Sequence, residues 1–442
     1  MINRRRFTQQ LAATVGAISL GGVARGEGRS LAPELRVDGD RINRQLLELS
    51  QFGKNPYGGV SRVAYSEFDR QAREWAMNLM REAQLSVSID AAGNIFGRRA
   101  GSEATLNPLV FGSHIDSVPD GGNYDGDVGS LSAIEVARTL AANTLVTRHP
   151  LEVVIFQNEE GGTVGSRALI GEVSPEDLQL KSNSGKTIGD GIAFLGGDAS
   201  KLASVKRAPG EIAAYVELHI EQGGNLDREG LDIGVVEGIV GIGQWEVTAT
   251  GMANHAGTTA MGDRHDSLLA TARYIDMVNR VITGTPGRQV GTVGRVQAFP
   301  GAPNVIPGKA IFTLEIRDLD QARVDMLSAK VRAEGEAIGR DTGCTFAYSS
   351  LHHSRPALCD ARVKQTIEAS ARGLALSTRH LPSGAGHDAQ HMARLGPAGM
   401  IFVPSVGGIS HAPKEFTKPQ DVVNGANVLL HTILALDTAA WT

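Results

Sequence analysis

Four short apolar stretches of this chain each lead directly into a segment that carries histidine or acidic side chains. They are residues 109–111 before His114, residues 151–156 before Glu159 and Glu160, residues 213–218 before His219, and residues 399–403 before His411. Short apolar runs bounded by turn residues predict buried strands. Open α/β sheets place their sites at the carboxyl ends of such strands. The pattern therefore predicts an α/β fold with a mixed, mostly parallel sheet that carries chemistry along one edge.

The length of 442 residues favours about two domains. Between residues 239 and 354 the pattern changes to four predicted strands, one of them at 290–298, and two helices, at 266–281 and 321–338. Such a set is typical of a small α+β domain. We therefore expect a catalytic metal-binding domain in two parts, residues 36–238 and 355–442, interrupted by a lid domain at 239–354.

The N-terminus, residues 1–30, has the pattern of a twin-arginine signal peptide. Arg4-Arg5-Arg6 precedes Phe7, and an apolar run then extends from Leu11 to Leu20 before small residues. The run is short for a membrane span. The pattern predicts export to the periplasm, and the alternative is an amphipathic N-terminal helix.

The net charge and the cysteine count limit the kinds of partner and metal site that the protein can have. The net charge of -5 gives no bias toward nucleic acid or an anionic membrane surface, and neither is expected as a partner. The only cysteines are Cys344 and Cys359, which excludes a thiolate metal cluster. They could pair, although two buried free thiols are the favoured interpretation.

Five side chains that follow the predicted strands are of types that bind divalent cations: His114, Asp125, Glu160, His219 and His411. The set combines imidazole nitrogens with carboxylate oxygens, which suits Zn²⁺, Mn²⁺, Co²⁺ or Ni²⁺ without choosing among them. Two ions are expected, because a carboxylate such as Asp125 can bridge cations roughly 3.5–4 Å apart. A charged group at the end of an apolar strand is costly to bury unless it is paired or bound to metal.

Two further acidic residues lie beside these candidates. Asp116 follows His114 by two residues and is expected to accept a hydrogen bond from the second ring nitrogen of that histidine. Glu159 precedes Glu160, and a free carboxylate beside an activated water suits a general base that later protonates the leaving nitrogen. Singly, a histidine at a strand end is more often structural and a Glu-Glu pair more often a solvated turn, so the prediction depends on the whole set.

Seven motifs resemble those of the hydantoinase/carbamoylase family, in the order that this family keeps. They are residues 112–119, 158–161, 217–223, 254–259, 303–308, 383–389 and 408–411. The family includes N-carbamoyl-L-amino-acid hydrolases, allantoate amidohydrolases and β-ureidopropionases, within the clan of dinuclear aminoacylases and carboxypeptidases. The resemblance extends from about residue 40 to the C-terminus and implies a catalytic domain with a lid and dimerisation domain.

The resemblance also implies roles at matching positions. Two divalent metal ions would be held as follows: one by His114 and His219, the other by Glu160 and His411, and both by Asp125. Glu159 would be the general base, with Asp116 and His255 at the same catalytic centre. The ions would share an activated water that attacks the substrate carbonyl.

Substrate contacts are implied for His255, Asn304 and Arg317 in the lid, and for Gln222 and the backbone of Gly386. A guanidinium such as that of Arg317 offers a planar fork for a carboxylate, and His255 could donate to the oxygen that gains charge. From the residues alone, Asn304 is equally well explained as a turn residue, and Arg317 as an ion-pair partner. In relatives the lid histidine and asparagine come from the other subunit, which implies a homodimer.

The sequence thus predicts a metal-dependent hydrolase of a linear amide or ureido C–N bond in N-carbamoyl-amino-acid-like or allantoate-like substrates. One alternative is an exopeptidase or N-acyl-amino-acid deacylase of the same clan, and another is an inactive periplasmic binding protein. The loop 161–166 is shorter than in many relatives, which bears on substrate preference.

Overall fold

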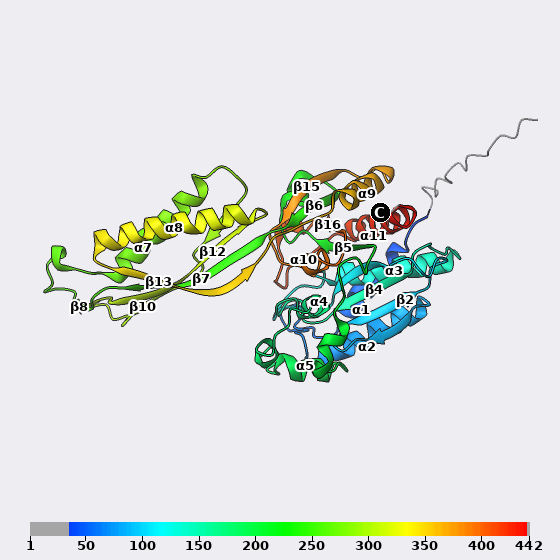
Figure 1. Ribbon diagram of the computed structural model, residues 1–442, viewed down its shortest axis with the longest axis horizontal. Coiled ribbons are helices and arrows are strands. Elements are labelled where there is room, and N and C mark those ends of the chain that lie inside the picture. Colours follow the sequence, from blue (N-terminus) through cyan, green and yellow to red (C-terminus); the bar gives the residue numbers. More distant parts are fainter. Residues whose placement is uncertain (1–34, 440–442) are drawn as a thin grey trace, which may run out of the picture. The chain divides into compact units, whose positions relative to one another are not determined.

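The computed structural model describes residues 35–439, and the predicted signal peptide at 1–30 lies outside this range. The described residues form a nine-stranded mixed sheet and a separate five-stranded antiparallel sheet (Figure 1). The predicted fold class is therefore confirmed. In the described part of the chain, no helix has the length and apolar character needed to cross a membrane.

The main sheet has the order β1-β2-β4-β3-β5-β16-β6-β14, with β15 beside β6. Its strands are β1 (Ser86–Ile89), β2 (Ile95–Arg99), β3 (Leu109–His114), β4 (Leu151–Phe156), β5 (Ala214–Ile220), β6 (Ile233–Ile239), β14 (Ala357–Leu358), β15 (Thr378–Ser383) and β16 (Ala398–Val403). Neighbours among β4, β3, β5 and β16 pair in parallel. Their carboxyl ends therefore lie at one edge of the sheet, as the sequence pattern predicts.

Helices cover both faces of these central strands, which is why the strands are buried throughout. The helices of this part are α1 (Gly39–Leu49), α2 (Glu67–Glu82), α3 (Asp127–Ala142), α4 (Val164–Ile170), α5 (Ile188–Phe194), α6 (Asn225–Glu229), α9 (Ala361–Gly373), α10 (Ala389–Met392) and α11 (Pro419–Thr438). Leu169 of α4 and Met392 of α10 share a core cluster with Val154 and Phe402. Helices α3 and α11 pack against each other and against β3 and β5.

The second sheet has the order β10-β12-β7-β13, with β9 also beside β12. Its strands are β7 (Gly241–Thr250), β9 (Val290–Thr292), β10 (Val296–Phe299), β12 (Lys309–Asp318) and β13 (Thr345–Ser354). Helices α7 (Ser267–Thr283) and α8 (Gln321–Thr342) lie side by side on this sheet (Figure 1). Buried side chains such as Tyr274, Phe312 and Leu327 form their common core.

The prediction of a single strand at residues 290–298 is wrong, because two strands, β9 and β10, occupy this segment. Four positions separate Thr292 from Val296, whereas three separate their partners Glu315 and Phe312 on β12. The extra residue interrupts the ladder, as in a β-bulge. Periodicity alone does not reveal such an insertion. Elsewhere, Cys344 and Cys359 are buried and free, as the composition favours.

Candidate metal centre

The first group of potential metal ligands consists of His114, Asp125 and His219. His114 ends β3, His219 lies near the end of the neighbouring strand β5, and Asp125 lies in the turn before α3. Oδ1 of Asp125 is 3.4 Å from Nε2 of His114 and 3.2 Å from Nε2 of His219. All three side chains are buried, and one ligand atom from each lies within 4.8 Å of the others.

The second group consists of Asp125, Glu160 and His411. Nε2 of His411, in the loop after β16, is 3.3 Å from Oδ2 of Asp125 and 3.5 Å from Oε2 of Glu160. The ligand atoms of this group also lie within 4.8 Å of one another. Asp125 therefore belongs to both of these groups and presents a different oxygen to each. A third buried group of possible ligands does not include Asp125 and consists of Glu217, His219 and His387. The five side chains that the sequence singles out are thus brought together.

The electrostatics of the cluster fit divalent cations. Nε2 of His114 and Oε1 of Glu160 are buried and, within residues 35–439, have no hydrogen-bond partner. Burial raises the pKa of Glu160 to about 8, and the nearby carboxylate of Asp125 adds to this effect. Buried polar atoms without partners and clustered carboxylates are costly unless a cation compensates them. The residues present therefore fit a metal centre.

Backbone carbonyls orient both buried imidazoles. Nδ1 of His114 lies 3.0 Å from the carbonyl oxygen of Asp116, and Nδ1 of His219 lies 3.0 Å from that of Ile220. When each Nδ1 donates to its carbonyl, Nε2 is left as an acceptor facing Asp125. This is the usual way in which a protein fixes the tautomer of a metal-binding histidine.

The carboxylate of Asp116 has a different partner from the one the sequence suggests. Its Oδ1 lies 3.6 Å from Nδ1 of His114, beyond hydrogen-bond range, because that nitrogen meets the backbone carbonyl instead. The carboxylate accepts hydrogen bonds from the backbone N–H groups of Glu159 and Glu160, both at 3.2 Å. Asn158, with a positive φ of 49°, turns the chain so that both N–H groups reach Asp116.

Glu159 lies beside the metal-ligand cluster but in neither ligand group. Its side chain is buried, and Oε2 lies 3.8 Å from Nε2 of His114. Burial raises the pKa of Glu159 well above its ordinary value, opposed by the nearby imidazole of His114. A carboxyl group in this position can accept a proton from a molecule bound between the ligands.

Two of the predicted substrate contacts lie close to this cluster or to its loops. Nε2 of Gln222 is 2.6 Å from Oδ2 of Asp125 and 3.3 Å from Nε2 of His411. Arg317 of β12 donates from Nη1 to the carbonyl of Gly384 at 2.6 Å, and Glu315 holds its Nε at 2.7 Å. The guanidinium therefore lies beside the loop that contains Gly386.

Two further predicted contacts, His255 and Asn304, lie together in the lid. His255 lies in β8 (Asn254–His255), and Asn304 directly precedes β11 (Val305–Ile306), the strand that pairs with β8. The carbonyl of Asn304 accepts a hydrogen bond from the backbone N–H of Ala256. Both side chains are exposed. Within residues 35–439, no hydrogen bond or ion pair joins them to the metal-ligand cluster. The structure therefore does not bring them to the ligands of their own chain.

Sequence reasoning missed three buried residues near the ligands. Glu415 bonds to the loops of two ligands, Glu217 accepts from Ser113 and Tyr215, and the ring of His387 lies 4.5 Å from that of His219, centroid to centroid. Glu415 has no local apolar pattern and so resembles a solvated surface residue, whereas Glu217 lies inside the apolar run 213–218 and in the motif at 217–223. His387 belongs to the motif at 383–389, and that membership was the available signal.

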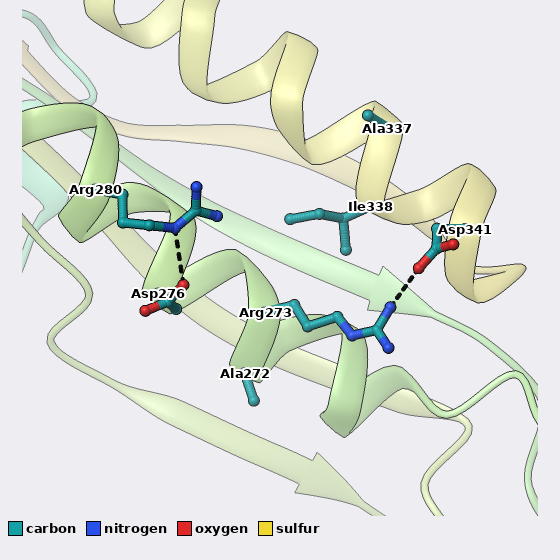
Figure 2. Close-up of a pocket in the computed structure, with 7 residues that line it drawn as sticks. All are labelled: Ala272, Arg273, Asp276, Arg280, Ala337, Ile338 and Asp341. Atoms are coloured by element: carbon teal, nitrogen blue, oxygen red, sulfur yellow. Dashed lines mark hydrogen bonds and ion pairs between the residues drawn. The ribbon is translucent and has the colours of Figure 1, made fainter. Parts of the chain in front are cut away.

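A surface hollow that holds no candidate ligand lies between α7 and α8. Figure 2 shows Arg273 paired with Asp341 and Arg280 paired with Asp276, the latter at 2.9 Å, around Ala272, Ala337 and Ile338. Its charged groups already have partners, and it holds none of the metal-ligand candidates. The hollow is therefore separate from the metal centre.

Comparison with known proteins agrees with this geometry. The model of Peptidase family M20/M25/M40 matches residues 110–435. The chain is 39% identical over 405 residues to an N-carbamoyl-L-amino acid amidohydrolase of Geobacillus stearothermophilus, a match covering 90% of this chain and 99% of the relative. It is 37% identical over 406 residues to a ureidoglycolate hydrolase of Oryza sativa subsp. japonica, covering 89% and 84%.

A solved structure is similar over nearly the whole chain. The crystal structure of an amidase of the hydantoinase/carbamoylase family from Burkholderia multivorans superposes with a TM-score of 0.85 at 38% identity, covering 92% of this chain and 99% of that one. The long, high-identity matches and the shared fold leave one assignment. The chain belongs to the Peptidase M20 family and, within it, to the hydantoinase/carbamoylase amidohydrolases.

Proposed function

We propose that the protein uses two divalent cations to cleave the C–N bond of a linear ureido or carbamoyl group in a small carboxylate-bearing substrate. N-carbamoyl-amino acids, allantoate and ureidoglycolate are the candidate substrates. The observation that carries the proposal is the position of Asp125, which faces one ligand group with Oδ1 and the other with Oδ2. Glu159 stands beside the cluster, outside both groups, and is free to move a proton.

The proposed mechanism assigns the proton to Glu159. Cations held by His114, Asp125, Glu160, His219 and His411 would polarise the substrate carbonyl and lower the pKa of water. The carboxylate of Glu159 takes the proton from the attacking water and returns it to the leaving nitrogen. Asp116 keeps Glu159 in place, because its carboxylate accepts a hydrogen bond from the backbone N–H of Glu159. Burial of Glu159, His114 and His219 shields the proton carrier from bulk water, and the half-exposed His411 lies on the open side of the cluster.

Recognition of the substrate carboxylate is assigned to Arg317. Its guanidinium can form two parallel hydrogen bonds to a carboxylate, and its bond to Gly384 places it near the loop of Gly386. We assign His255 and Asn304 to a second subunit's active site, because they are exposed and without contacts to the ligands of their own chain. The working enzyme would then be a homodimer.

The second candidate function is that of an exopeptidase or N-acyl-amino-acid deacylase. The match to a peptidase family favours it. Both functions use the same ligands and base, so only substrates separate them. The twin-arginine pattern of the N-terminus supports a periplasmic location, which fractionation of cells into periplasm and cytoplasm would test.

The test is turnover of a substrate panel by the purified protein loaded with Mn²⁺. N-carbamoyl-amino acids, allantoate or ureidoglycolate should be hydrolysed, and dipeptides and N-acetyl-amino acids should not. Glu159→Gln should lower kcat by about 10²- to 10⁴-fold while metal content is unchanged. Glu176→Gln, at an exposed position, is the control. Turnover of dipeptides alone would reject the proposal, and binding of ureido compounds without turnover would favour a binding protein.

A further inference from the structure

We infer that Glu415 is a positioning residue of the metal centre, whose carboxylate holds the loops of Asp125 and His411 at a fixed separation. Glu415 lies between β16 and α11 and is only 4% exposed. The inference rests on the proposed function, because it concerns the site of the same two metal ions. It adds a residue that is neither a ligand nor a proton carrier.

The two oxygens of Glu415 serve two different loops. Oε1 accepts hydrogen bonds from the backbone N–H groups of Tyr124 and Asp125, both at 3.0 Å. Oε2 accepts from the hydroxyl of Ser410 at 2.8 Å and from the backbone N–H of His411 at 3.2 Å. One carboxylate thus bonds directly to the backbone of one ligand from each loop.

Neighbouring contacts strengthen the same connection. The hydroxyl of Ser410 is also 3.2 Å from Oδ2 of Asp125, so it lies between the two carboxylates. The ring of Tyr124 meets that of Phe416 edge to face, with centroids 5.7 Å apart. At Gly122 a Cβ would lie 2.2 Å from Oε1 of Glu415, so the first loop must carry glycine to admit the carboxylate.

The connection matters because neither loop is regular structure. His411 has a positive φ of 52°, a conformation that a non-glycine residue adopts only when its surroundings impose it. The bond from its backbone N–H to Glu415 is one such constraint. Asp125 must present its two oxygens to two ligand groups at once, which requires its backbone to be fixed as well. Glu415 meets both requirements with one side chain.

The test is Mn²⁺ affinity of the purified protein after its metal has been removed by a chelator. Glu415→Gln keeps the shape but supplies one acceptor oxygen and an NH₂ group that faces donors, so two of the four bonds are lost. We expect Mn²⁺ binding, measured by titration calorimetry, to weaken about 10- to 100-fold. We expect saturating Mn²⁺ to restore most of the turnover, which a merely unfolded protein would not show.

Asp437→Asn is the matched control. Asp437 is a buried carboxylate on α11 that accepts from the backbone N–H groups of Arg148 and His149 at 2.9 and 2.8 Å, on loops that carry no ligand. The Asp437→Asn variant should be less stable than the wild type and should keep the wild-type Mn²⁺ affinity. Equal affinity of wild type and Glu415→Gln would overturn the inference, as would an equal loss in both variants. Failure of the wild type to bind Mn²⁺ would instead reject the proposed function.

A milder variant serves if Glu415→Gln does not fold. Ser410→Ala removes one of the four donors and leaves the carboxylate and the three backbone bonds in place. A two- to ten-fold loss of Mn²⁺ affinity is expected, the effect of one hydrogen bond. Unchanged affinity in this variant would overturn the inference.

Discussion

Oδ2 of Asp125 and Nε2 of His411 lie 3.3 Å apart, although Asp125 lies in the loop after β3 and His411 in the loop after β16. No local segment of the chain contains this pair, so it exists only when the whole main sheet is formed. Metal binding and folding should therefore be coupled. The connection through Glu415 gives that coupling a physical path.

Arg317→Lys should weaken the binding of carboxylate-bearing substrates. A lysine cannot form the two parallel hydrogen bonds of a guanidinium, so KM should rise about 10- to 100-fold, the effect of losing a charged hydrogen bond. Steady-state kinetics on an N-carbamoyl-amino acid measure this. The control is Arg295→Lys, at an exposed lid residue paired with Glu246 at 2.8 Å. An unchanged KM for Arg317→Lys would reject its role in recognition.

Arg62→Met should destabilise the fold strongly. Arg62 and Asp127 form a fully buried ion pair with N–O distances of 2.8 and 2.6 Å, and Arg62 also donates to the carbonyl of Ile115. Removing the guanidinium leaves a buried carboxylate unpaired, which lowers the free energy of unfolding by about 3–5 kcal/mol. Chemical denaturation of the metal-free protein measures it. The double variant Arg62→Met/Asp127→Leu should recover most of the lost stability. A loss below about 1 kcal/mol in Arg62→Met alone would contradict a stabilising role for this buried ion pair.

His391 should make stability fall in mild acid. Burial lowers the pKa of His391 to about 4, and Arg167 and Arg394 also disfavour its charge against the opposing effect of Glu172. Its Nε2 lies 2.8 Å from the hydroxyl of Thr163. Because the folded pKa is below the unfolded value of about 6.5, the stabilisation is complete above pH 6.5 and is lost as pH falls toward 4.

The comparison with His391→Gln isolates this effect, because other titrating groups are the same in both proteins. Relative to the variant, the wild type should lose about 2 kcal/mol of unfolding free energy between pH 7 and pH 5. Denaturant unfolding across this range supplies the measurement. Parallel pH dependence of the two proteins would show that His391 is not held neutral.

The main sheet and its ligands could be predicted because the information is local. An apolar run predicts a buried strand, and His114 or His219 at its end then lies at the common edge of parallel strands. This local pattern alone predicts that the five ligand candidates lie near one another. The same local pattern gave the two lid helices.

What the sequence does not contain is the choice of partner between distant loops. The Asp116 carboxylate bonds to the backbone of Glu159 and Glu160 and not to the ring of His114, which depends on the turn at Asn158. Glu415 is reached only when the loop after β16 meets the loop after β3. The division between β9 and β10 is likewise set by pairing with β12.

The central claim is that Asp125 serves two ions, one with each oxygen, and it can be measured directly. Crystals grown with Mn²⁺ should show two anomalous-difference peaks per chain roughly 3.5–4 Å apart. One peak should lie nearest Oδ1, beside His114 and His219, and the other nearest Oδ2, beside Glu160 and His411. A single peak, or two peaks of which only one contacts Asp125, would contradict the account.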